Sequence, residues 1–309
     1  SIQTSCDFLH AIFGEQPPGA VVLFAIPGER SFWCTRGEPR AIQRALTISI
    51  PSHNVYFGVS LQNRAAADVL WREANPGAKG EPTTRGYSNS AMAFPGFWVD
   101  IDIQSPAHAS LNLAPTKEDA RRLIERFPLP PSLLWDTGYG LQAMWLFREL
   151  WVFDSDTERD EAKIMVKRFL ASLNVPASEY GWKIDPTTDF ARVLRLPGTY
   201  NRKLTTPLPV TLLLNHPETR YNLSDFTPHL VEMIAPRPVI ASVKTSAAIT
   251  RDLHRATEAL HFLPADSYDD WIRMGMALHA ADPGAEGFGV WASWSQICPA
   301  KFDADVTQY

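Results

Sequence analysis

The chain has 309 residues, a formal net charge of −5 and a hydrophobic fraction of 45% that includes ten tryptophans. This composition excludes an intrinsically disordered chain and allows two domains with a sizeable core. The acidic balance excludes a general electrostatic attraction to nucleic acid, so any such binding must use a local basic stripe.

Strand and helix patterns alternate through the first 233 residues. The expected strands are 20–26, 54–61, 133–135, 141–147, 193–196 and 210–214, and the expected helices are 2–13, 39–46 and 156–173, with another after Thr116. Residues 62–95 are rich in Gly, Pro, Ser, Asn and Thr and are expected to form a long excursion. Strands that alternate with helices favour an α/β or α+β architecture.

The segment 96–103 is an apolar strand that carries two carboxylates, Asp100 and Asp102. Strand side chains alternate faces, so both carboxylates project to the same side. Their repulsion is unfavourable unless a cation lies between them, and hard divalent cations such as Mg²⁺ bind carboxylate oxygens together with substrate phosphates. The segment predicts metal-assisted phosphoryl chemistry, with a solvated strand end as the alternative.

A glycine-containing turn, Thr137-Gly138-Tyr139-Gly140, lies between two segments that predict a hairpin. Glycines let a backbone approach a ligand closely, and exposed amides in such a turn bind phosphate oxygens. An ordinary hairpin turn is the alternative.

Positive charge concentrates in residues 184–203 of this acidic chain. The basic residues are Arg192, Arg195, Arg202 and Lys203, and two carboxylates precede them, Asp185 and Asp189. Nucleotidyl transfer requires a carboxylate that completes a metal site and guanidinium groups that face triphosphate oxygens. Intramolecular Asp–Arg pairing on a surface turn is the alternative.

The character of the sequence changes after residue 233. Residues 234–249 have no clear period and are expected to be a linker. Residues 250–309 predict a small all-α module with helices at 251–262, 269–280 and 287–295, and its tryptophans at helical spacing are expected in its core.

The cysteines and the apolar runs indicate where the protein works. Cys6, Cys34 and Cys298 are scattered, form neither a zinc spacing nor a disulfide framework, and fit a reducing cytoplasm. No apolar run approaches the length of a membrane helix, no secretory signal is present, and the missing initiator Met indicates a trimmed chain. We therefore expect a cytoplasmic protein with no membrane partner.

Taken together, the three motifs resemble the catalytic core of the archaeo-eukaryotic primase superfamily, in particular phage- and plasmid-type primase-polymerases. The shared pattern is an hDhD strand, then S/T-G-x-G-x-H, then an Asp before R-x-x-R-x-P-G-T-x-N-x-K. The helical tail resembles the primase C-terminal module of such proteins. The resemblance implies an α+β fold, with an RRM-like catalytic sheet and an additional small α/β unit in residues 1–233, followed by a small all-α domain.

The resemblance also implies an activity and its residues. It implies template-directed nucleotidyl transfer, with de novo primer synthesis and primer extension on single-stranded DNA, in replication of a phage or plasmid-like element. Asp100, Asp102 and Asp185 would hold Mg²⁺ or Mn²⁺, with Asp189 as the rival of Asp185. The residues implied to face the dNTP or NTP are Thr137, Gly138, Tyr139, Gly140, Gln142, Arg192, Arg195, Asn201 and Lys203. A helicase region or partner is a further implied association.

Gln142 departs from the family pattern, which has histidine at this position. Glutamine can still donate a hydrogen bond to a phosphate oxygen, but it neither carries positive charge nor transfers a proton as imidazole does. The departure leaves open a catalytically impaired module that binds nucleic acid or nucleotide. The paired carboxylates leave open a metal-dependent nuclease.

Overall fold

The computed structural model of the chain describes residues 1–35, 40–80, 84–108, 110, 112–232, 246–260, 263, 268–282 and 284–297. The chain divides into two compact units, residues 1–233 and 234–309. Residues 234–245 of the expected linker lie outside the described residues. Residues 246–249 form the start of helix α7 (Ser246–Leu260), so the helical module begins before residue 250.

The larger sheet of the first unit has six strands in the order β11-β6-β7-β5-β4, with β12 paired to β7. The strands are β4 (Leu61–Gln62), β5 (Ala91–Asp102), β6 (Leu133–Asp136), β7 (Gly140–Val152), β11 (Thr211–Asn215) and β12 (Arg220–Tyr221). Neighbours are antiparallel except for β12, which runs parallel to β7. The predicted hairpin is confirmed as β6 and β7.

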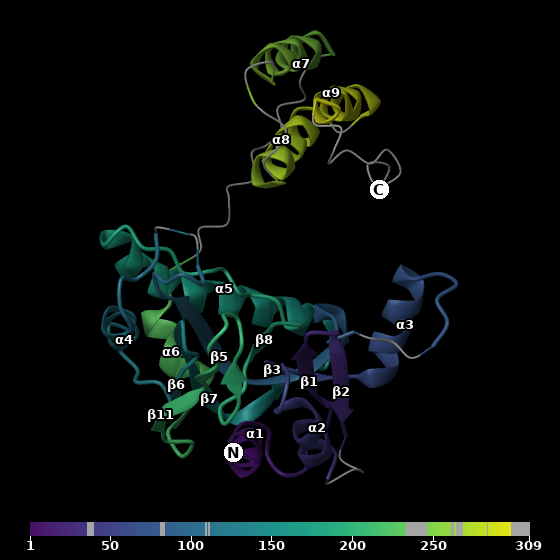
Figure 1. Ribbon diagram of the computed structural model, residues 1–309. Coiled ribbons are helices and arrows are strands. Elements are labelled where there is room, and N and C mark those ends of the chain that lie inside the picture. The colour runs from purple at the N-terminus through teal and green to yellow at the C-terminus, as the bar shows by residue number, and fades with distance from the viewer. Residues whose placement is uncertain are drawn as a thin grey trace. The chain divides into compact units, whose positions relative to one another are not determined.

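One face of the larger sheet is covered by three helices, α4 (Lys117–Glu125), α5 (Asp156–Glu179) and α6 (Leu223–Phe226), as Figure 1 shows. Aromatic rings hold these layers together. Phe97 of β5 stacks on Phe169 of α5 with ring centroids 4.8 Å apart and meets Phe226 of α6 edge-on at 4.9 Å. Such pairs bury large apolar surfaces and favour offset or edge contacts.

Side-chain alternation along β5 turns the two carboxylates away from these helices. Phe97 faces the helices, so Asp100 and Asp102, an odd number of residues further on, face the opposite side. In the antiparallel register Asp100 lies opposite Gln142, and Asp102 lies opposite Gly140.

The smaller sheet has four antiparallel strands in the order β2-β1-β3-β8. Its strands are β1 (Val21–Ile26), β2 (Arg30–Cys34), β3 (Asn54–Gly58) and β8 (Val193–Arg195), and its helices are α1 (Ile2–Phe13) and α2 (Ala41–Ser49). The pairing of β3 with β8 brings the basic segment into this sheet. These two sheets and their helices confirm the predicted α+β class, with a main sheet and an additional smaller α/β unit.

Helix α1 joins the two sheets through one aromatic side chain. Phe8 meets Phe57 of β3 and Trp135 of β6 edge-on, with ring centroids 5.3 and 5.2 Å away. All three rings are buried. The junction of the sheets is therefore part of a packed core.

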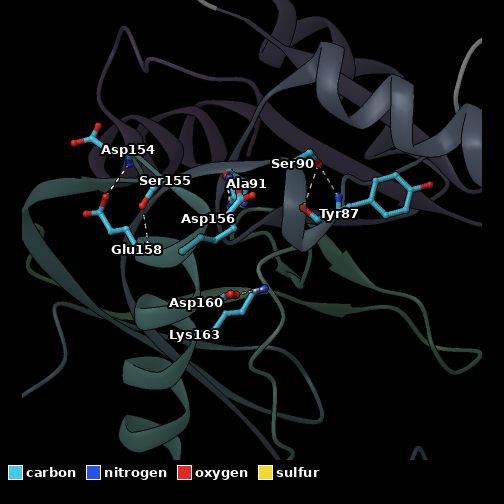
Figure 2. A network of polar contacts seen from close by, with 10 residues as sticks. Tyr87, Ser90, Ala91, Asp154, Ser155, Asp156, Glu158, Asp160 and Lys163 are labelled. Atoms are coloured by element: carbon cyan, nitrogen blue, oxygen red, sulfur yellow. Dashed lines mark hydrogen bonds and ion pairs between the residues drawn. The ribbon is translucent and has the colours of Figure 1, made fainter.

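Helix α5 begins at a set of capping contacts that Figure 2 shows. The Ser155 hydroxyl accepts a hydrogen bond from the Glu158 amide, and the Glu158 carboxylate accepts one from the Asp154 amide at 2.8 Å. The Ser155 contact satisfies an amide of the first helical turn, and the Glu158 contact holds the chain just before the helix. The helix runs to Glu179, past the predicted end at residue 173.

The expected excursion at residues 62–95 is wrong for much of its length. It contains helix α3 (Arg64–Ala74), a 3₁₀ turn η1 (Ser88–Ser90) and the start of β5. Asn63 caps α3 by accepting a hydrogen bond from the Ala66 amide at 3.1 Å. The Gly- and Pro-rich residues that follow α3 obscured this signal.

The second unit contains three helices within its described residues: α7, α8 (Tyr268–Ala281) and α9 (Ala285–Ser295). Leu253, Leu260, Leu278 and Trp294 form its buried core, as expected for apolar residues at helical spacing. The Trp271 indole donates to the Ser295 hydroxyl at 2.8 Å and thereby joins α8 to α9. No helix in the described part of the chain is long and apolar enough to cross a membrane.

Candidate active site

A cavity of about 270 Å³ lies between the two sheets of the first unit. Its walls come from β1 and β3 on one side and from β5, β7 and the β6–β7 turn on the other, with the basic segment closing it. The sequence-predicted residues that line it are Asp100, Asp102, Thr137, Tyr139, Gln142, Arg192, Arg195, Asn201 and Lys203. Three separate stretches of the chain therefore converge on one cavity.

Asp100 and Asp102 are two neighbouring acidic side chains that line this cavity. Burial raises the pKa of Asp100 above its ordinary value, while Arg192 and a hydrogen bond from the Gln142 side chain oppose the rise. Burial and the Asp100 charge raise the pKa of Asp102 to about 7. The pair is thus poised to gain a positive partner, either a proton or a cation.

Basic side chains supply part of that positive charge. Nη2 of Arg192 lies 3.5 Å from Oδ2 of Asp100. Nδ1 of His108 lies 3.1 Å from Oδ2 of Asp102, and Nζ of Lys203 lies 3.5 Å from Nε2 of the same imidazole. Burial and the Lys203 charge lower the pKa of His108, which favours a neutral ring that accepts at Nε2 and donates from Nδ1.

Asp185 and Asp189 have different environments. The charge of Asp185 raises the pKa of both Asp100 and Asp102, which places it within electrostatic reach of the pair. The Asp189 carboxylate instead accepts hydrogen bonds from the Ser88 hydroxyl and from the Ala191 amide, and so closes a turn. Asp185 is therefore electrostatically coupled to the pair, although it does not line the cavity. Among the described residues, no three His, Cys, Asp or Glu side chains are grouped closely enough to hold a metal ion.

Arg195 lines the cavity in a fixed orientation. Its guanidinium lies over the Tyr56 ring, 4.8 Å from the centroid, and donates from Nη1 to the Asn54 side chain at 2.9 Å. Burial lowers the pKa of Arg195, although guanidinium groups stay charged in proteins. The cavity therefore contains a preoriented planar cation.

The two basic residues at the end of the basic segment, Arg202 and Lys203, have different surroundings. Lys203 lines the cavity, whereas the Arg202 guanidinium donates to the backbone carbonyls of Ile50 and Pro51. The Asn201 amide donates to the Thr137 carbonyl at 2.6 Å and so fixes the β6–β7 turn. Asn201 thus supports the cavity wall through its side chain.

Backbone conformation and lack of space explain the glycines of the β6–β7 turn. Gly138 has a φ of +94°, and a Cβ on Gly140 would lie 2.5 Å from the Ile101 carbonyl oxygen. The Gly138 amide donates to the Asp136 carboxylate, and the Thr137 amide donates to the Gly140 carbonyl. Both amides have partners within the protein. Neither glycine lines the cavity.

Three polar residues of the cavity lining were not among the predicted site residues: Tyr56, Arg85 and His108. Tyr56 alternates with the buried Val55 and Phe57, so its outward direction follows from the strand pattern. His108 follows a segment with no period, and the sequence carries no signal that it approaches Asp102.

The donor set fits a hard divalent cation. Asp100 and Asp102 present carboxylate oxygens from one face of β5, and their mutual repulsion would be relieved by a cation between them. Nitrogen and sulfur ligands of a zinc or copper site are absent from the described lining except for His108.

Comparisons with known proteins give one family match and two structural similarities. Residues 254–309 match the family model described as Primase C terminal 2 (PriCT-2). The AEP domain of cyanophage S-2L primase-polymerase (PrimPol) aligns with a TM-score of 0.47 and 15% identity, over 75% of this chain and 98% of that chain. Primase RepB′ aligns with a TM-score of 0.40 and 12% identity, over 99% of this chain and 84% of that chain.

No curated protein matches the chain by sequence. The family match covers the end of α7 and all of α8 and α9, whose packing around Trp294 is described above. It confirms the predicted C-terminal primase module.

Proposed function

We propose that this chain is a primase-polymerase, a template-directed nucleotidyltransferase that makes primers de novo and extends them on single-stranded DNA. The observation that carries the proposal is the convergence of Asp100 and Asp102 with Arg192, Arg195 and Lys203 on one cavity. The primase C-terminal module in the same chain supports it. Replication of a phage or plasmid-like element is the process that this activity would serve.

Some cavity residues would bind the metal ions, and others would bind the triphosphate. Asp100, Asp102 and Asp185 would hold Mg²⁺ or Mn²⁺, which lowers the pKa of an attacking hydroxyl and stabilises the charge of a leaving pyrophosphate. Arg195 and Lys203 would face the triphosphate, whose negative charge they offset.

Arg192 and His108 lie beside the proposed metal ligands. Both now contact the carboxylates of the pair, at 3.5 and 3.1 Å. Phosphate oxygens that share a cation with the carboxylate pair would lie close to both side chains. We therefore include them among the groups that orient the nucleotide.

The experiment is primer synthesis on circular single-stranded DNA with labelled dNTPs or NTPs and Mn²⁺ or Mg²⁺, with and without a supplied primer. Wild type is compared with Asp100→Asn/Asp102→Asn. Asp156→Asn/Asp160→Asn is the matched control, since it changes two exposed carboxylates on α5. We expect labelled products from wild type and the control and none from the Asp100/Asp102 variant.

Two other outcomes would replace the proposal. Shortened template fragments that form without nucleotides, and depend on Asp100, would indicate a metal-dependent nuclease. DNA or nucleotide binding without synthesis, unchanged in the Asp100/Asp102 variant, would indicate a binding module. The basic side chains in the cavity favour synthesis, because a nuclease has no need of a triphosphate site.

A further inference from the structure

Gln142 connects the two sheets next to the carboxylate pair. It lies on β7 opposite Asp100, and its side chain is buried. Its Oε1 accepts hydrogen bonds from Nε1 of Trp135 on β6 at 2.9 Å and from the Arg195 amide on β8 at 3.0 Å. Asp100 is its cross-strand neighbour, and the Gln142 side chain lowers the pKa of that carboxylate. One amide oxygen therefore links β6 and β7 of the larger sheet to β8 of the smaller sheet.

The orientation of this amide is fixed by its partners. An indole N–H and a backbone N–H are donors only, so the atom that both of them approach must be the carbonyl oxygen of Gln142. The NH₂ group is then the part of the side chain that can donate to the neighbouring Asp100 carboxylate, whose pKa the Gln142 side chain lowers. All the partners shown for the side chain are protein groups, and both lone pairs of Oε1 are used.

We propose that Gln142 is a positioning residue that orients the Asp100 carboxylate for cation binding and ties it to the strand that carries Arg195, and that it does not contact the nucleotide. The inference rests on the proposed function, in which Asp100 is a metal ligand. It changes the role expected for this position, where a phosphate contact was predicted. Outer groups that orient a metal-binding carboxylate typically account for 10- to 100-fold in metal affinity.

The chemistry of imidazole shows why histidine cannot take over this role. A neutral imidazole has one acceptor nitrogen, whereas the glutamine carbonyl oxygen accepts two hydrogen bonds. A histidine at position 142 that donates to Asp100 would leave either the Trp135 indole or the Arg195 amide without a partner. The family-like residue should therefore impair this particular site.

The test measures Mn²⁺ affinity of the full chain by electron paramagnetic resonance of free Mn²⁺, without nucleotide. Wild type is compared with Gln142→Met and Gln142→His. Gln62→Met is the matched control, because Gln62 is equally buried and hydrogen-bonded, to Ser60 and Ser90, and does not line the cavity. We expect both Gln142 variants to bind Mn²⁺ at least ~10-fold more weakly than wild type and the control to bind as wild type does.

Steady-state kinetics at saturating Mn²⁺ provide the second readout. A positioning role predicts a lower kcat and little change in the KM for nucleotide. An unchanged Mn²⁺ affinity with a raised nucleotide KM in Gln142→Met would overturn the inference, as would a gain in nucleotide affinity in Gln142→His. Should Gln142→Met not fold, Gln142→His and the control decide the question in the same way.

Failure of the inference and failure of the proposed function have different signatures. Wild type that binds no Mn²⁺, or binds it equally after Asp100→Asn, refutes the proposed function. Wild type that binds Mn²⁺ through Asp100, with equal affinity in both Gln142 variants, leaves the function intact and refutes the positioning role.

Discussion

At the scale of single residues, Asp102 combines burial with a neighbouring like charge. Its carboxylate shares one face of β5 with Asp100, and the basic groups around it only partly compensate. Such an arrangement costs stability in the cation-free protein, because the folded state favours the protonated form. Clustered groups with shifted pKa values are typical of functional sites.

The pKa of Asp102 has a consequence for stability against pH. In the folded protein it is raised from 3.8 to about 7, so the folded state binds more protons than the unfolded state between these values. The Asp102 contribution therefore destabilises the cation-free protein progressively as pH rises from about 4 to about 7. The difference in the free energy of unfolding between Asp102→Asn and wild type should therefore shift in favour of the variant as pH rises from 5 to 8.

Thermal unfolding of both proteins in chelator, at pH 5 and pH 8, measures this difference. The pH dependence of wild type alone is ambiguous, because the lowered pKa of His108 makes stability fall as pH falls, opposite to the effect of Asp102. The comparison with the variant separates the Asp102 contribution. An identical difference in Tm at both pH values would contradict the raised pKa of Asp102.

Asp185 and Asp189 should respond to mutation in opposite ways. Asp185→Asn removes a charge near the pair and should lower nucleotidyl transfer by more than about 100-fold with little loss of stability, since even outer-shell groups account for about 10- to 100-fold. Asp189→Ala removes an acceptor for Ser88 and Ala191 and should cost about 1 kcal/mol with activity retained. Urea unfolding and primer extension on the two variants test this pair. The reverse pattern would make Asp189 the third carboxylate.

At the scale of elements, the sequence predicts what local periodicity and turn chemistry encode. The β6–β7 hairpin and the shared face of Asp100 and Asp102 follow from two-residue alternation. The pairing of β3 with β8 carries no local signal, because it joins residues more than a hundred positions apart. Periodicity alone therefore could not place Arg195 over Tyr56 or show that the Gln142 side chain accepts a hydrogen bond from the Arg195 amide.

Helix α5 should contribute strongly to the stability of the first unit. Phe169 is fully buried and stacks on Phe97 beneath the strand that carries the carboxylates. Phe169→Ala would leave a cavity there and should destabilise the protein by about 3–5 kcal/mol. Denaturant unfolding measures this, with the exposed Val175→Ala on the same helix as control. A loss below about 1 kcal/mol would show that the aromatic layer can collapse around the deletion.

At the scale of the whole molecule, two units with separate cores are joined in one chain. The proposed reaction needs a catalytic cavity and a means of holding template and first nucleotide during initiation. The cavity lies in the first unit, and the primase C-terminal module is the natural candidate for the second task.

Removal of the residues after 233 should therefore affect initiation and extension unequally. We expect de novo priming to fall much more than extension of a supplied primer, because the cavity and its supporting core remain in residues 1–233. Parallel assays of both reactions, normalised to folded protein by circular dichroism, measure the ratio. Equal loss of the two activities would argue against this division of labour.

The most direct test of the central claim is a crystal structure of the full chain with Mn²⁺ and a non-hydrolysable nucleoside triphosphate. We predict anomalous scattering from Mn²⁺ at Asp100 and Asp102, with triphosphate oxygens against Arg192, Arg195 or Lys203. Mn²⁺ bound away from the pair, or a triphosphate bound outside this cavity, would contradict it.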